Sequence, residues 1–193
     1  RDLFAATAFR FAVGLLRGLS AMHELGYAHR DVKPRNLLVV CANKRDQETC
    51  SLRIADFRKT CAFLVTGEEG AQDRCQQPAG SDLFRPPEVS LAIAAGRQYA
   101  LPGDADVIVK QDSWAAGVVL YTILGGRYDY GCAPFNEAMQ QRWDSTFDGH
   151  RLLEVLPELL AESPSDRCRP EACLRILHRR RALEHPEQHR AAR

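Results

Sequence analysis

Residues 112–125 form a segment that is apolar almost throughout from Trp114 onward, and this pattern predicts a helix. A helix that is apolar on every side belongs at the centre of a domain, with other elements packed around it. Residues 3–25 can supply part of that cover, because apolar side chains recur there every three or four positions and Gly26 follows as a helix-ending residue. The 193 residues, 45% of them hydrophobic, suffice for one mostly helical domain. Further helices are expected near residues 88–95, 135–143, 150–161 and 170–184.

Two short β-prone segments, residues 37–40 and 52–55, interrupt the helical pattern. The residues between them are mostly polar, so the pair predicts a β-hairpin with a long connection. Irregular stretches punctuated by Gly and Pro follow at 56–87 and 96–111. The expected fold class is therefore α+β, with helices in the majority and one small hairpin.

A polar loop with the sequence HRDVKPRN lies directly before this hairpin, at residues 29–36. Asp31 can accept a proton from an attacking hydroxyl, and Lys33 can neutralise charge on a phosphoryl group in transfer. The amide oxygen of Asn36 is a hard ligand of the kind that Mg²⁺ prefers. A charged surface turn opened by Pro34 would explain the polarity of the loop, but not this combination of residue types. The loop therefore indicates phosphoryl-transfer chemistry.

Together with later motifs in the same order, this loop resembles the catalytic region of eukaryotic protein kinases. The later motifs are DFR at 56–58, GSDLFRPPE at 80–88, DSWAAG at 112–117, PF at 134–135 and an arginine at 167. The resemblance covers nearly the whole chain. It implies a kinase C-terminal lobe over residues 1–178 with the hairpin at the catalytic cleft, followed by a basic tail at 179–193. The N-terminal lobe is expected to lie outside this chain.

The resemblance also implies a role for each residue that matches a kinase motif. Asp31 should orient and deprotonate the substrate hydroxyl, and Lys33 should contact the γ-phosphate of ATP. Asn36, with Asp56 of the DFR motif, should bind the Mg²⁺ ions that bridge the ATP phosphates. The implied cofactors are ATP and Mg²⁺. Lys33 followed by Pro34 resembles serine/threonine rather than tyrosine kinases, so the expected partner is a protein with a Ser or Thr acceptor.

Other matched residues are expected to support the site. Glu88 and Arg167 should form a buried ion pair, and Asp112 should hold the backbone of the loop at 29–36 from below. His29 is expected to anchor that loop rather than to act as an acid or base, while Ser81 should hydrogen-bond beside the catalytic groups. Packing roles are expected for Trp114 and Gly117, and Arg30 implies regulation by a phosphate on the activation loop.

The chain departs from the kinase pattern in two places. Arg58 replaces a glycine that would give Asp56 backbone freedom, and it brings a cation near the metal site unless its side chain points to solvent. No glycine-rich strand-turn and no strand-borne lysine precede the loop at 29–36, so we expect a kinase fragment that is inactive without its N-terminal lobe. The alternative is a pseudokinase-like binding or scaffolding module. Residues 112–114, an insertion before them and the cysteine content faintly resemble the secreted rhoptry-type kinases of parasitic protists.

Charge and cysteine content limit the partners and leave the compartment open. The formal net charge of +1 gives no field that would attract nucleic acid, and no apolar run approaches the ~18 residues of a transmembrane segment. Of the seven cysteines, Cys41 and Cys50 can face each other across the hairpin or remain separate thiols. An oxidised pair would mean a secretory compartment. Localisation is thus unknown, with the cysteine count favouring the secretory pathway over the cytoplasm.

Overall fold

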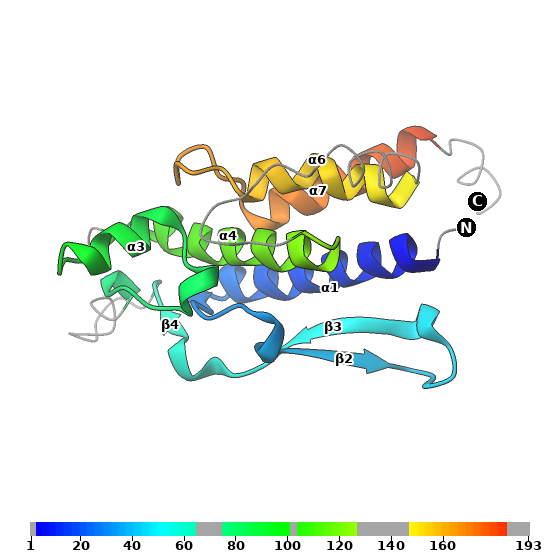
Figure 1. The fold of residues 1–193 in the computed structure, drawn as a ribbon, viewed down its shortest axis with the longest axis horizontal. Helices are drawn as coiled ribbons and strands as arrows, with labels where there is room; N and C mark the ends of the chain where they lie inside the picture. Colours follow the sequence, from blue (N-terminus) through cyan, green and yellow to red (C-terminus); the bar gives the residue numbers. More distant parts are fainter. Residues whose placement is uncertain (1–2, 65–74, 101–103, 127–146, 185–193) are drawn as a thin grey trace.

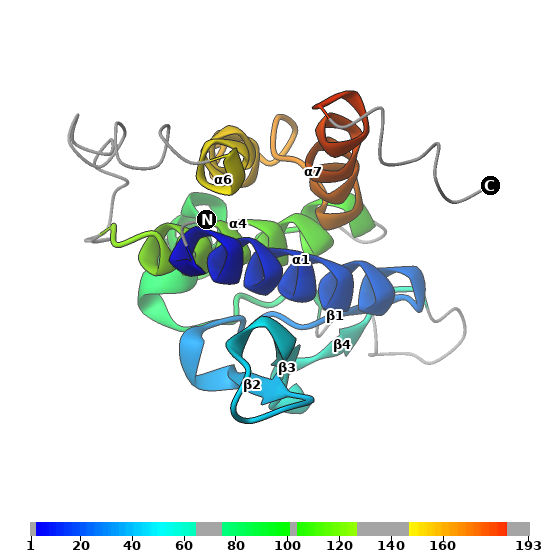
Figure 2. The ribbon, with the colours of Figure 1, turned by 90° about the vertical axis from the view of Figure 1, so that its right-hand side faces the viewer.

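The structure is a computed structural model whose described part comprises residues 3–64, 75–100, 104–126 and 147–184. Its helices there are α1 (Leu3–Glu24), α3 (Pro87–Ala94), α4 (Ala105–Ile123), α6 (Phe147–Leu159) and α7 (Pro170–Glu184). Its strands are β1 (Tyr27–Ala28), β2 (Leu37–Cys41), β3 (Cys50–Ile54) and β4 (Cys61–Ala62). Figure 1 and the turned view of Figure 2 show α6 and α7 on one side of α1 and α4, and the β2–β3 hairpin on the other. The expected α+β class is confirmed.

Helix α1 contributes an apolar face to the core. Leu15, Leu16 and Leu19 are fully buried, and α1 contacts α4, α6, α7 and β3. Within the described ranges it is the one helix whose length and composition would also allow it to cross a membrane, over Phe4–Glu24 with a mean hydropathy of 1.2. Apolar helices in protein cores also meet these criteria, and the buried leucines of α1 show that this helix packs in the core.

Helix α4 is the expected central helix, but it begins earlier than the sequence predicts. Residues 105–111 were expected to belong to a loop, whereas the helix starts at Ala105, because the carboxylate of Asp104 accepts a hydrogen bond from the backbone N–H of Val107 at 3.4 Å and caps the first turn. Every residue from 108 to 121 is buried. Gly117 permits this packing, since a Cβ there would lie 2.8 Å from the side chain of Leu160.

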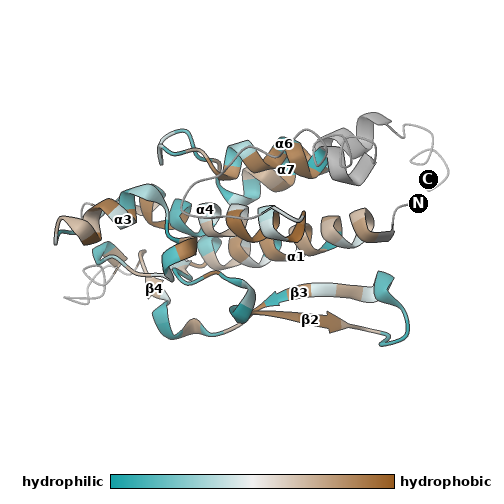
Figure 3. Cartoon of the chain, viewed as in Figure 1, coloured by the Kyte–Doolittle hydropathy of each residue, from teal (hydrophilic) through white to brown (hydrophobic). Residues whose placement is uncertain are grey.

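The predicted hairpin is confirmed, with strands slightly longer than expected. Strands β2 and β3 pair antiparallel from Leu37↔Ile54 to Cys41↔Cys50, and the two cysteines at the far end are joined by a disulfide bond. Figure 3 shows the apolar character of β2. Strand β3 lies against α1 at Gly14, where a Cβ would come within 3.1 Å of the Leu52 carbonyl oxygen. That glycine therefore serves close helix–strand packing.

The remaining expectations are met unevenly. Gly26 ends α1 with φ +82°, as predicted, and its backbone N–H donates to the carbonyl oxygen of His23. Helices α3, α6 and α7 correspond to three of the expected helices, while the expected helix at 135–143 lies outside the described residues. The boundary expected after residue 178 falls inside α7. Strand β4, which pairs with β1, was not predicted.

Candidate active site

The loop at 29–36 is held from below by one buried carboxylate. Asp112 of α4 accepts hydrogen bonds from the backbone N–H groups of His29 and Arg30, both at 2.7 Å, and from Nε2 of His23 at 2.9 Å. These bonds hold Arg30 at φ +66°, a left-handed conformation that is uncommon for a long side chain. Burial raises the pKa of Asp112, but the bond from His23 and the neighbouring charges outweigh it, so the net pKa lies below 3.8. The expected role of Asp112 is confirmed.

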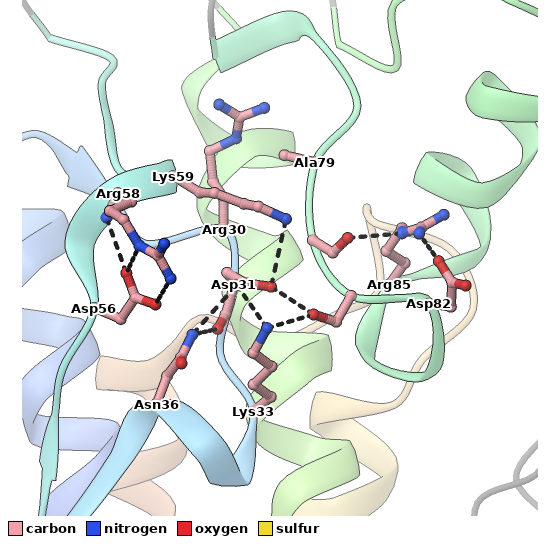
Figure 4. Close-up of polar contacts among 12 residues, drawn as sticks. Arg30, Asp31, Lys33, Asn36, Asp56, Arg58, Lys59, Ala79, Asp82 and Arg85 are labelled. Atoms are coloured by element: carbon pink, nitrogen blue, oxygen red, sulfur yellow. Dashed lines mark hydrogen bonds and ion pairs between the residues drawn. The ribbon is translucent and has the colours of Figure 1, made fainter.

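Asp31 follows directly and is surrounded by hydrogen-bond donors. Lys33 Nζ lies 2.9 Å from Oδ2, and the hydroxyl of Ser81 donates to Oδ1 at 2.9 Å. Lys33 Nζ also donates to Ser81 Oγ at 2.7 Å, which closes a triangle of three side chains. Figure 4 shows Lys33, Asn36 and Lys59 directed at the Asp31 carboxylate. The expected contacts of Ser81 are thereby confirmed.

Electrostatics keep the Asp31 carboxylate ionised. Burial raises its pKa, but the hydrogen bonds from Lys33 and Ser81 and the charge of Lys59 outweigh burial, so the net pKa lies below the ordinary 3.8. Lys59 Nζ lies 3.9 Å from Oδ1. Lys59 was not singled out from the sequence, because its position directly after the DFR motif carries no recognisable signal. An ionised, well-oriented carboxylate suits proton acceptance.

Asn36 and His29 tie the loop to the strand end that carries Asp56. The Asn36 side-chain amide donates from Nδ2 to the Asp31 carbonyl oxygen at 2.8 Å, which leaves its amide oxygen for another partner. The buried imidazole of His29 bonds through Nε2 to the carbonyl oxygen of Ala55 at 3.1 Å, and its ring meets the edge of Phe57. His29 is thus confirmed as an anchor, and it links the loop to the residue before Asp56.

Asp56 sits at the end of the hairpin in an unusual local geometry. Its backbone has φ +63°, and it caps the short 3₁₀ turn at 57–59. Both carboxylate oxygens are bound by the guanidinium of Arg58, at 2.7 Å from Nε to Oδ1 and 2.6 Å from Nη2 to Oδ2. The hydrogen bond from Arg58 is the main reason that the pKa of Asp56 falls to about 2. Arg58 therefore turns back onto Asp56, although its side chain is 87% exposed.

The oxygen donors fit a magnesium ion shared with phosphates. Mg²⁺ in phosphate sites is typically held by one or two protein oxygens, with phosphate oxygens and water as the other ligands. Asn36 and Asp56 offer an amide and a carboxylate oxygen of this type. Within the described ranges, no group of three or more His, Cys, Asp or Glu side chains forms a metal cluster. A magnesium ion here would share its coordination between these two side chains, phosphate oxygens and water.

The segment after residue 75 is fastened to the same loop and to the core. Arg30 donates through Nη2 to the carbonyl oxygen of Gln77, and Gln111 of α4 donates to the carbonyl oxygen of Ala79 at 2.9 Å. A second disulfide, Cys61–Cys75, joins β4 to the start of this segment. The sequence did not indicate this pairing, because no spacing pattern distinguishes these two cysteines from the others.

The buried ion pair expected between Glu88 and Arg167 is confirmed. Two guanidinium nitrogens of Arg167 contact the two carboxylate oxygens of Glu88 at 2.7 and 3.0 Å. The same guanidinium lies over the ring of Trp114, 5.0 Å from its centroid. Trp114 is itself buried, so its expected packing role is confirmed too. The pair links α3 to the segment that leads into α7.

Comparison with known proteins agrees with this geometry. The family model for the protein kinase domain matches residues 3–179, and the chain belongs to this family. Serine/threonine-protein kinase grp of Drosophila melanogaster is 31% identical over 178 residues, covering 86% of this chain and 30% of that protein. Calcium-dependent protein kinase 5 of Solanum tuberosum is 31% identical over 187 residues, covering 93% and 28%. Serine/threonine-protein kinase STK11 of Homo sapiens is 32% identical over 116 residues, covering 60% and 22%. The chain thus spans less than a third of each of these relatives.

Proposed function

We propose that this chain is part of a serine/threonine protein kinase that transfers the γ-phosphate of ATP to a Ser or Thr hydroxyl of a protein substrate. The observation that carries the proposal is the triangle of Asp31, Lys33 and Ser81, in which a carboxylate and an ammonium group lie 2.9 Å apart beside a hydroxyl. The names of the Drosophila and human relatives support the serine/threonine class, as does Pro34 after Lys33.

In this proposal each side chain acts at a defined atom. Asp31 accepts the proton of the substrate hydroxyl as its oxygen attacks the γ-phosphorus, and the low pKa of Asp31 keeps the carboxylate ready for that proton. Lys33 offers positive charge to the phosphoryl group as it moves between oxygens. Asn36 and Asp56 are the residues that would hold Mg²⁺, which supplies charge neutralisation at the ATP phosphates when bound.

We also propose that the chain forms the C-terminal lobe of the kinase domain and has little activity by itself. No glycine-rich turn or strand-borne lysine precedes the loop at 29–36 in this sequence, and these are the parts that cover and clamp the nucleotide in kinases. The coverage of less than a third of each relative is consistent with this assignment. Phosphoryl transfer should therefore be measured on the full-length protein.

The experiment is a radiolabelled transfer assay with the full-length protein, Mg²⁺, γ-labelled ATP and a generic protein acceptor. Asp31→Asn should lower the transfer rate by about 10²- to 10⁴-fold, because the proton acceptor is lost while the side-chain shape is kept. Nucleotide binding, followed by thermal shift, should be retained. Undiminished transfer in the Asp31→Asn protein would refute the assignment of Asp31 as the base.

A pseudokinase-like binding module is the second candidate, and one observation favours it. Arg58 occupies both oxygens of the expected metal ligand Asp56. The intact set of Asp31, Lys33, Asn36 and Asp56 favours catalysis instead. A full-length protein that is stabilised by ATP but transfers no label, even with Arg58 replaced, would support the binding module.

A further inference from the structure

The proposed phosphoryl transfer assigns no role to the contact between Arg58 and Asp56, which stands where a metal ligand is proposed. Each oxygen of the Asp56 carboxylate receives one N–H of the same guanidinium, at 2.7 and 2.6 Å. Such two-point contacts between a guanidinium and a carboxylate combine charge with matched geometry and are the stronger kind of charged hydrogen bond. In Figure 4 the Arg58 side chain lies directly against that carboxylate.

The local backbone brings the two groups together. Asp56 has φ +63° and caps the turn at 57–59, so the side chain two positions later lies on the same side as the carboxylate. The backbone N–H of Arg58 also donates to Asp56 Oδ1 at 3.4 Å. Among the described residues, no other hydrogen bond or ion pair involves the Arg58 guanidinium. Asp56 therefore supplies the hydrogen bonds and the ion pair that hold the Arg58 guanidinium.

Three positively charged side chains face the two carboxylates of the site. The carboxylate of Asp31 faces Lys33 and Lys59, whereas Asp56 faces Arg58. A divalent cation bound at Asp56 would lie beside a guanidinium of the same sign of charge. The two cations would therefore compete for one carboxylate.

We propose that Arg58 is an internal competitor for the metal ion, occupying the Asp56 carboxylate until Mg²⁺ displaces it. The inference rests on the proposed function, because it takes Asp56 as a metal ligand. Arg58 is then a positioning residue that raises the Mg²⁺ concentration needed for binding. The contact is solvent-exposed, and exposed ion pairs are weak, so the expected shift is about two- to fivefold in metal affinity.

The test is a titration of the full-length protein with Mn²⁺ in saturating ADP, with free Mn²⁺ followed by electron paramagnetic resonance. Arg58→Ala should bind Mn²⁺ about two- to fivefold more tightly than the wild-type protein. Arg58→Lys keeps the charge but loses the two-pronged geometry, so its affinity should lie between the two. In steady-state assays, Arg58→Ala should lower the Mg²⁺ concentration that gives the half-maximal rate.

Two further variants separate the possible explanations. Lys59→Ala removes a neighbouring cation that faces Asp31 rather than Asp56, so it should leave the Mn²⁺ affinity within the error of the wild type. Asp56→Asn should weaken Mn²⁺ binding. Arg58 is exposed, so its variants should fold normally, which a thermal melt will verify.

The outcomes that overturn the inference differ from those that overturn the proposed function. Equal Mn²⁺ affinity in wild type and Arg58→Ala, with weaker binding in Asp56→Asn, would reject the competition and leave the kinase proposal standing. Equal tightening in Arg58→Ala and Lys59→Ala would also reject it, because charge alone would then explain the effect. Unchanged binding in Asp56→Asn would reject both the inference and the proposed metal site.

Discussion

Asp31 and Asp56 are the two carboxylates of this site. Residues distant in the sequence help to hold Asp31, whereas a residue two positions away holds Asp56. Asp31 is 7% exposed and takes partners from its own loop and from Lys59 and Ser81, which lie far along the chain. The Asp56 side chain is 26% exposed, and its hydrogen bonds come from Arg58, two positions away. Tertiary structure thus fixes the first carboxylate, and a local turn holds the second. The proposed base is preset, whereas the proposed metal ligand remains adjustable.

Removing the Asp112 carboxylate should disrupt the loop that carries Asp31 and give the largest change in stability. Asp112→Ala leaves the buried N–H groups of His29 and Arg30 without an acceptor and His23 without its partner. The free energy of unfolding should fall by about 3–5 kcal/mol, measured by urea denaturation. Glu48→Ala is the control, because removing this exposed carboxylate should cost no more than about 1 kcal/mol. Equal losses in both variants would contradict the anchoring role.

The two disulfides can be used to test whether the turn that carries Asp56 depends on the nearby Cys61–Cys75 bond. Cys61 lies just after the turn that holds Asp56, while the Cys41–Cys50 bond lies at the distal end of the hairpin. Replacing either pair by serine should cost about 3 kcal/mol, because the closed loops are similar in length. Only the Cys61→Ser/Cys75→Ser protein should also lose phosphoryl transfer beyond the loss of folded protein. An equal loss of phosphoryl transfer in both double variants would contradict a specific role of the Cys61–Cys75 bond in holding this turn.

Acidification should reduce the stability that Asp112 contributes to the folded protein. Its pKa is lowered in the folded protein, so the unfolded chain binds the proton more tightly. The stability contributed by this group is therefore complete above the unfolded value of 3.8 and is lost as the pH falls through the lower folded value. Melting temperatures measured from about pH 6 down to pH 3 should drop less steeply in Asp112→Ala than in wild type. An identical pH slope would show that other carboxylates dominate.

The smallest effect is expected at Arg58. Its contact with Asp56 is exposed and local, so Arg58→Ala should leave the thermal midpoint unchanged within error. A clear drop in the midpoint would mean that the turn at 57–59 depends on the guanidinium. Asp56 would then be held as firmly as Asp31. Scanning calorimetry of the same variant used for metal titration gives this measurement.

The sequence predicted the fixed half of the site well, because its contacts follow from a motif that specifies residue type and spacing. The bonds of Asp112 to the loop, the Ser81 contacts and the Glu88–Arg167 pair were all expected and are observed. The direction of the Arg58 side chain was left open. Its position depends on the left-handed backbone at Asp56, which residue types alone do not reveal.

The fold was less predictable where tertiary contacts decide the local structure. The sequence predicts residues 105–111, which include the polar Lys110 and Gln111, as part of a loop. In the structure both are buried, and Lys110 is paired with Asp106 and the carbonyl oxygen of Ser165. Strand β4 has two residues and exists only through its pairing with β1. Such elements carry no periodic signal of their own.

The packing of α1 against α7 has a consequence for how the protein is made. Helix α1 leaves the ribosome first among the described elements, while α7, which covers part of its leucine face, leaves last. During synthesis the part of α1 that packs against α7 stays uncovered until almost the whole segment has emerged. The nascent chain should therefore depend on chaperones that shield apolar surface, and ribosome-bound intermediates stalled before residue 170 should be prone to aggregation.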